Sequence, residues 1–246
     1  MTRARWLVGA VAVVLVLGAG VWFTLLRDDA PQAVDLASAL SAAAQQPANS
    51  PTAASATPAP AGSPATGAAS SLAGTWTLVS GASFVGYRVN EELANIGAKT
   101  AVGRTSAVTG TLTFDGAAIT AVEVTADLRQ LRSDETRRDR ALEMQALETA
   151  RFPSATFVLT APIRLERAPA EGGTVRAAAT GDLTLHGVTR RVEVPIEGQF
   201  QGGRAVVVGS LDIRFADFGI AQPRAQLVLS VEDHGVIELQ LVFERR

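Results

Sequence analysis

The chain has 246 residues, with 24 acidic against 22 basic side chains, a formal net charge of −2 and no cysteine. Because the chain is slightly acidic and has no long basic run, we do not expect it to bind nucleic acid. The lack of cysteine excludes disulfides, a thiolate nucleophile, Cys-ligated metal sites and an anchor through a lipid-modified cysteine. Any membrane anchor must therefore come from the polypeptide itself.

The N-terminal residues 1–27 predict an uncleaved signal anchor. Residues 6–26 contain no charge, and a helix of this length reaches about 31 Å, the thickness of a bilayer core. Arg3 and Arg5 precede this stretch, which predicts a short cytoplasmic N-terminus and a single pass through a bacterial cell membrane. The rest of the chain is then extracytoplasmic.

The alternative for the same residues is a cleaved signal peptide, with the small residues Gly18, Ala19 and Gly20 as the cleavage region. Signal peptides have an apolar core of roughly 7 to 15 residues, shorter than this stretch. If cleavage occurs, the domain is secreted or periplasmic.

Residues 28–74 predict a disordered linker. From Ala30 to Ala73 the chain consists mainly of Ala, Pro, Ser, Thr and Gln, with Asp35 as the only charge. Such a composition has too few large apolar residues to form a core. As a flexible chain it would span roughly 35 to 40 Å and tether a domain to the membrane.

Residues 75–246 predict an all-β domain. In 119–128 and 190–200 apolar and polar side chains alternate with a period of two, so that each strand has one dry and one wet face. Eight to ten such strands suit either an antiparallel barrel or a sandwich. The predicted corners between strands are Asp115-Gly116, Gly172-Gly173, His186-Gly187, Gly202-Gly203 and His234-Gly235. Pro195 within a strand indicates a bulge or an edge.

Residues 133–153 break this pattern and predict one helix. Ser133 is the expected N-cap, acids follow it in the first turn, and Pro153 is expected to end the helix. A single helix in an all-β domain is placed to cover the open end of a barrel.

The two histidines are the first candidates for chemistry. His186 is better explained as part of a turn than as a proton-transfer group. Glu232, Asp233 and His234 are metal-ligand residue types, but neighbouring strand residues point to opposite faces, so a metal site is not expected. The chain contains no catalytic motif with an orienting partner, and we expect no enzyme activity. A reaction at His234, assisted by Glu232 or Asp233, is the remaining enzymatic alternative.

Two further features leave their interpretation open. Five arginines within 129–140 alternate with acids, and they form either a phosphate-binding group or a solvated helix face with local ion pairs. An eight-stranded barrel is just wide enough to be filled by side chains or to hold one small ligand. Because the dry faces here are rich in Val, Leu, Ile, Ala and Phe, such a ligand must be largely apolar.

The order of segments in 75–246 resembles the YceI-like family of exported lipid-binding domains. The segments that carry the resemblance are Trp76, SFVGYRV at 83–89, Arg138-Asp139 leading the helix, RFPSATF at 151–157, GDLTLHGVTR at 181–190 and DIRFADFGI at 212–220. The resemblance implies an extended, lipocalin-like antiparallel barrel of about eight strands that takes up a long isoprenoid or quinone-like chain. It also implies that His186-Gly187 is a corner between paired strands.

The chain departs from this family in two places. Many members have a histidine and two phenylalanines in the helix region, where this chain has Ala141, Ala146 and Leu147. In addition, Ala216 separates Phe215 from Asp217. These differences imply that the helix side of the ligand site has its own shape.

Strand alternation and the resemblance together predict a membrane-anchored carrier, storage or protective protein for an isoprenoid-type lipid. Apart from this lipid no cofactor or metal is expected, and the oligomeric state is left open, a homodimer included. The residues predicted to line the ligand site are Phe84, Tyr87, Phe157, Leu183, Leu185, Ile213, Phe215 and Phe218, with Arg137 and Arg138 as head-group contacts. The alternative is a filled barrel that acts as a structural or stress-response interaction module.

Overall fold

The structure is a computed structural model, and it describes residues 30–45, 72–94, 97–165, 169–223 and 228–245. Within these residues an eight-stranded antiparallel barrel closes, because the last strand pairs with the first. In spatial order its strands are β1 (Gly74–Leu78), β4 (Val108–Phe114), β5 (Ala118–Asp127), β7 (Ser154–Leu159), β9 (Thr174–Leu185), β10 (Val188–Gln201), β11 (Arg204–Arg214) and β13 (His234–Arg245). The prediction of an all-β antiparallel barrel is confirmed, and closure decides against a sandwich.

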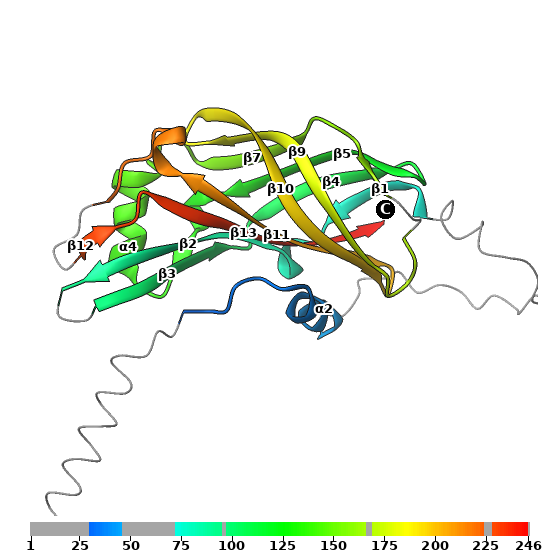
Figure 1. Cartoon of the computed structure of the whole chain (residues 1–246), viewed down its shortest axis with the longest axis horizontal. Helices are drawn as coiled ribbons and strands as arrows, with labels where there is room; N and C mark the ends of the chain where they lie inside the picture. Colours follow the sequence, from blue (N-terminus) through cyan, green and yellow to red (C-terminus); the bar gives the residue numbers. More distant parts are fainter. Residues whose placement is uncertain (1–29, 46–71, 95–96, 166–168, 224–227, 246) are drawn as a thin grey trace, which may run out of the picture.

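A two-stranded ribbon extends the barrel at one end (Figure 1). It consists of β2 (Phe84–Leu93) and β3 (Gly97–Thr105). Strand β13 pairs with β1 through residues 243–245 and with β2 through residues 236–240, so it carries the barrel into the ribbon. Three short strands complete the sheet: β6 (Arg132–Ser133) on β3, β8 (Ile163–Arg164) on β5 and β12 (Val228–Val231) on β2.

Apolar side chains point inward along the strands as the alternation predicts. In β10, Val194 is buried and Ile196 is half-buried in the core, while Pro195 between them is exposed. Pairing of β10 with β11 begins at Ile196. Pro195 therefore lies where one side of β10 becomes an edge, which is where a residue without an N–H donor can be accommodated.

Four of the five predicted corners connect strands, but His234-Gly235 does not. These two residues pair with Arg214 and Ile213 as the first residues of β13. The turn falls instead at Glu232 and Asp233, between β12 and β13.

The helix predicted over 133–153 is shorter than expected. It consists of α4 (Thr136–Ala141) and one π-helical turn, η3 (Leu142–Ala146). Ser133 belongs to β6, where it pairs with Gly103, so the chain there is extended and Ser133 is not the cap. The N-cap is Glu135, whose carboxylate accepts a hydrogen bond from the Arg137 backbone N–H. The remaining short helices are the 3₁₀ turns η1 (Ser80–Ala82), η2 (Leu128–Gln130) and η4 (Phe215–Phe218).

A second helix, α2 (Leu36–Gln45), lies on the outside of the barrel beside β11 (Figure 1). The prediction that 28–74 is disordered throughout is wrong for these residues. Leu36, Ala39 and Ala43 recur at helical spacing on the side of α2 that packs against Val206 and Val242. The small alanines bring the helix close to the sheet, so few large apolar residues are needed.

The predicted transmembrane stretch 6–26 and the linker residues 46–71 lie outside the described residues. Of the helices that the structure describes, none has the length and apolar character required to cross a bilayer.

Candidate functional site

The inside of the barrel contains a row of apolar cavities. In the described part of the chain they have volumes of about 160, 120 and 100 Å³, here called cavities A, B and C. Cavities A and B share Leu183 and Ile237, whereas B and C share Ile119 and Ile163. Because neighbouring cavities have common walls, they follow one another along the barrel, a shape that suits a long, narrow apolar ligand.

Cavity A lies at the end of the barrel that α4 and η3 cover. Leu142, Ala146 and Leu147 line it from the helical side, and Leu185 and Ile237 line it from the sheet. The segment after η4 completes the wall with Ile220, Ala221 and Pro223. The expectation that the helix covers an open end of the barrel is confirmed.

The polar side chains in cavity A include Tyr87, Glu91 and Arg138, which we call the polar corner. The Arg138 Nη2 atom donates to Glu91 Oε1 at 2.6 Å, and Glu91 is 8% exposed. The same guanidinium also pairs with Asp134. Burial by itself would lower the pKa of Arg138, but hydrogen bonding and the charge of Glu91 raise it above its ordinary value. Arg138 is therefore a permanent cation that already has carboxylate partners.

The Tyr87 hydroxyl is buried and makes no hydrogen bond within the described residues. Ser133 is the hydroxyl group among the side chains that affect the Tyr87 pKa, and it lowers this pKa, but the Ser133 hydroxyl donates its own proton to Asp139 Oδ1 at 2.7 Å. Burial raises the pKa of the Tyr87 phenol well above its ordinary value, and the Arg138 charge offsets only part of this rise. Tyr87 is therefore a neutral donor without an acceptor, at the wall of an apolar cavity.

Seven of the ten predicted site residues line the cavities. They are Tyr87, Leu185, Ile213, Phe215 and Arg138 in cavity A, Phe157 in cavity B, and Leu183 in both. Their contact with a ligand stays a prediction.

The other three predicted residues lie elsewhere. Phe84 is on the outer face of β2, where the Arg104 guanidinium lies 4.3 Å from its ring centroid, because its neighbour Val85 takes the inward position. Phe218 is buried in the core around Leu128 but lines none of the cavities. Arg137 is exposed on α4, whereas its neighbour Arg138 lines cavity A.

Several cavity residues were missed by the sequence reasoning. Val85 and Val89 flank Tyr87 at a spacing of two, so the alternation within β2 could have identified both. No local signal indicates Leu131, Ala221 or Pro223, which reach cavity A from segments without regular periodicity.

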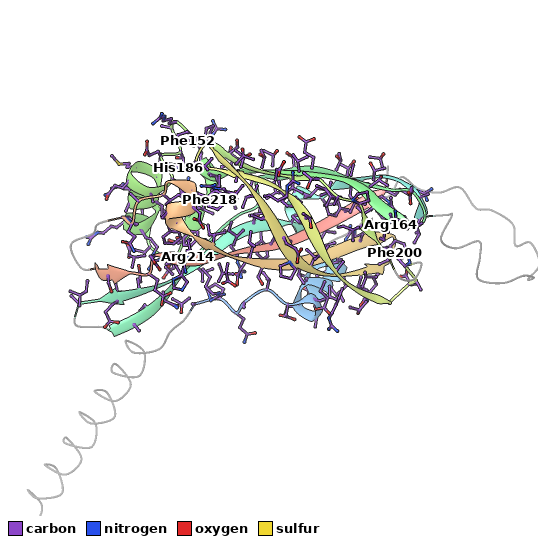
Figure 2. All side chains as sticks on the ribbon, turned by 45° about the horizontal axis from the view of Figure 1, so that its top comes forward. Phe152, Arg164, His186, Phe200, Arg214 and Phe218 are labelled. Carbon is purple, nitrogen blue, oxygen red and sulfur yellow. The ribbon has the colours of Figure 1, made fainter. Side chains whose placement is uncertain are left out.

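His186 is a structural residue of the β9–β10 turn. It has a φ of +52° and is followed by Gly187 at +74°, as a tight corner between paired strands requires. Its Nδ1 atom lies 3.1 Å from the Phe218 carbonyl oxygen, and its ring meets that of Phe152 edge-on, with centroids 4.5 Å apart. Figure 2 shows Phe152, His186 and Phe218 together at one end of the barrel. This contact holds the turn against η4.

His234 lies on the surface at the start of β13. Its Nδ1 atom is 2.9 Å from Asp233 Oδ1, and its Nε2 atom is 3.5 Å from Glu232 Oε2. The hydrogen bond with Asp233 raises the pKa of His234 above its ordinary value. The described residues contain no group of three or more side chains placed to hold a metal ion.

The arginines of 129–140 mostly have local partners. Arg129 binds Asp127 through two nitrogen atoms at 2.9 Å each, and Arg132 donates to the backbone carbonyls of Arg129 and Leu131. This arrangement favours the solvated face with local ion pairs over a phosphate-binding group.

Comparison with known proteins identifies the domain. Residues 76–243 match the family model described as the YceI-like domain. A UPF0312 protein of Shewanella denitrificans is 35% identical over 137 residues, which are 52% of this chain and 68% of that protein.

Two solved structures have a similar fold. A polyisoprenoid binding domain from Saccharophagus degradans, implicated in plant cell wall breakdown, superimposes with a TM-score of 0.55 at 18% identity, over 70% of this chain and 98% of that one. Burkholderia cenocepacia BcnA superimposes with a TM-score of 0.52 at 22% identity, over 67% of this chain and 98% of that one.

Proposed function

Because the chain belongs to the YceI-like family, we propose that it is a membrane-anchored, extracytoplasmic binding protein for an isoprenoid or quinone-like lipid. The row of cavities A, B and C inside a closed barrel is the observation that carries this proposal. The polyisoprenoid binding of the Saccharophagus degradans domain supports the same ligand class. The charge-free stretch 6–26 supplies the anchor, and the protein carries, stores or protects the lipid without catalysing a reaction.

The apolar chain of the lipid would occupy the cavities. Burial of apolar surface contributes about 25 cal/mol per Å², so a chain of several isoprene units gains a large binding free energy from this alone. The shared walls at Leu183 and Ile237 let one continuous chain extend from cavity A into cavity B after small side-chain movements.

The polar corner would hold the head group of the lipid. Arg138 is already paired with Glu91 and Asp134, so it offers little uncompensated charge to a diphosphate. The Tyr87 hydroxyl, in contrast, is a buried donor without a partner. A neutral head group with an acceptor oxygen, such as a quinone carbonyl or a prenol hydroxyl, would satisfy this donor.

Native mass spectrometry tests the proposal. Residues 30–246, which keep α2 and every strand of the barrel, are to be expressed with an export signal in a bacterium and purified without detergent. We expect a stoichiometric adduct that denaturing analysis identifies as an isoprenoid or quinone. A bare protein that also fails to take up added isoprenoid lipid contradicts the proposal and favours the filled-barrel interaction module.

A matched pair of variants locates the lipid. Ala155 lies in the wall between cavities A and B, whereas Ala178 is exposed on β9. Ala155→Leu fills the passage between the two cavities and should reduce lipid occupancy severalfold. Ala178→Leu adds the same atoms to an outer surface and should leave occupancy unchanged. Equal occupancy in both variants would place the lipid outside the barrel.

A further inference from the structure

Residues 30–45, here called the docking segment, are held along the outside of the barrel by three arginines. Arg88 donates to the Pro31 carbonyl oxygen at 2.6 Å and Arg104 to that of Gln32 at 3.1 Å. At the other end of the segment, Arg204 donates to the Ala43 carbonyl oxygen at 2.8 Å. The segment therefore follows the wall from β2 and β3 to β11.

A buried carboxylate shows that the barrel wall is adapted to this segment. Ile237 and Leu239 line the cavities, so Glu238 between them points outward from β13. Glu238 is nevertheless only 2% exposed, and it pairs with Arg88 at 2.9 Å and Arg104 at 3.5 Å. A charged group on an outer face is normally solvated. Here it is buried against the two half-buried arginines that hold the docking segment.

Docking changes the length of chain that separates the barrel from the membrane. The charge-free stretch ends at Leu26 and the docking segment begins at Ala30. Four residues reach at most about 14 Å, much less than the span expected for a tether of residues 28–74. Both ends of 46–71 connect to the barrel, so these residues do not add to the distance from the membrane.

The docking segment begins near the ribbon end of the barrel (Figure 1). Pro31 is bound by Arg88, and five residues later β2 ends at Leu93. A strand rises about 3.3 Å per residue, so the tip of the ribbon is about 17 Å from Arg88. This distance is close to the reach of the chain between Leu26 and Pro31, so the ribbon tip can lie at the membrane surface.

The same end exposes large apolar side chains. Met144 in η3 is 75% exposed and Leu229 in β12 is 68% exposed. Both elements also form the wall of cavity A, through Leu142 and Val231. Among the described residues, Val158 on β7, at 44%, is the other exposed large hydrophobic side chain. Met144 and Leu229 therefore expose apolar side chains on elements that also line cavity A.

We propose that the barrel end formed by η3, β12 and the ribbon tip rests on the lipid bilayer, with Met144 and Leu229 in the head-group region. Cavity A then opens at the membrane surface, and an isoprenoid lipid passes between bilayer and barrel without crossing water. This inference rests on the membrane anchor of the proposed function.

Single-cysteine labelling tests this orientation, because the chain has no cysteine of its own. The full chain is reconstituted in vesicles of phosphatidylethanolamine with a minority of phosphatidylglycerol, and an environment-sensitive fluorophore is attached at Met144→Cys or Leu229→Cys. Nitroxide-bearing phospholipids should quench both labels severalfold more than labels at two control sites. The controls are Val158→Cys, an exposed apolar position on β7, and Gln201→Cys, at the β10–β11 turn.

A pair of insertions tests the role of the docking segment. A Gly/Ser stretch of about twenty residues adds about 25 Å of reach. Inserted between Asp28 and Asp29, it should abolish the difference in quenching, whereas the same stretch between Gly62 and Ser63 should leave it unchanged.

Equal quenching at all four labelled sites, or equal effects of the two insertions, would overturn the inference. A full chain that alkaline carbonate washes off the vesicles would overturn it as well. None of these measurements requires a bound isoprenoid. A failure of lipid binding in the mass spectrometry experiment is therefore distinguishable from a failure of the membrane orientation.

Discussion

The ring of Phe157 in β7 lies directly against Gly181 in β9, so that a Cβ atom at residue 181 would be 2.3 Å from Phe157 Cζ. Phe157 lines cavity B. We expect Gly181→Ala to push the ring into this cavity and to lower the free energy of unfolding by about 1–3 kcal/mol, the usual cost of overpacking. Denaturant unfolding measures the stability, and native mass spectrometry should show lower lipid occupancy.

Gly173→Ala is the control for this substitution. Its Cβ atom would meet its nearest neighbour, the Ala170 carbonyl oxygen, only at 3.2 Å, and Gly173 lines none of cavities A, B and C. A smaller loss of stability and no change in lipid occupancy are expected. If Gly181→Ala behaves like this control, the close contact does not shape the cavity.

Tyr87 is the only tyrosine of the chain, so ultraviolet titration of the folded protein reports its phenol alone. Burial raises the pKa of this group, and we expect ionisation well above pH 10, the value of an exposed tyrosine. The folded state holds the phenol proton of Tyr87 more tightly than the unfolded state does. The stabilisation from this raised pKa is therefore complete below about pH 10 and is lost as the pH rises further. Tyr87→Phe should remove this loss of stability at alkaline pH. A wild-type phenol that titrates at the pH of an exposed tyrosine would contradict the buried position of Tyr87.

Tyr87→Phe should also separate stability from binding. The hydroxyl is buried without a partner, and removing an unsatisfied donor leaves stability unchanged or raises it by about 1 kcal/mol. If the hydroxyl donates to the lipid head group, the same variant should lose about 0.5–1.5 kcal/mol of binding free energy. Thermal unfolding and lipid competition measure the two effects. Equal affinity of both proteins for a quinone would rule out Tyr87 as a head-group contact.

His186 is expected to affect the fold without affecting the ligand. His186→Asn introduces a residue that also tolerates positive φ. It loses the contact with the Phe218 carbonyl, which should lower the free energy of unfolding by about 1 kcal/mol. His186→Val should cost more, because a β-branched residue is strained at φ +52°. Chemical denaturation gives the order of stabilities. A loss of lipid binding in His186→Asn at full stability would contradict the structural role.

The sequence allowed prediction of those parts of the fold that depend on local pattern. Alternation identified the inward positions of β10, and the His186-Gly187 step identified the corner between β9 and β10. Alternation alone does not state which of two neighbouring apolar residues faces inward. For this reason Phe84 was predicted to face the inside of the barrel, although Val85 takes that position. Phe218 was misplaced because it belongs to η4, a turn that interrupts the strand periodicity after Arg214.

The docking segment and the polar corner depend on distant contacts. Leu36, Ala39 and Ala43 recur at helical spacing, but the residues that this helix packs against, Val206 and Val242, are about 160 or more positions away in the sequence. The pairing of Glu91 with Arg138 likewise joins β2 to α4, 47 residues apart. Such contacts follow from barrel closure, which a reading of local periodicity does not provide.

The position of α2 on the barrel has a consequence for cleavage of the chain. A single proteolytic cut anywhere within 46–71 would leave one fragment with the charge-free stretch and α2 and another with the thirteen strands that the structure describes. The packing of Leu36, Ala39 and Ala43 and the hydrogen bond from Arg204 to Ala43 would keep the two fragments together. Under the proposed membrane anchoring, the barrel would then stay at the membrane even after such a cut, attached by non-covalent contacts.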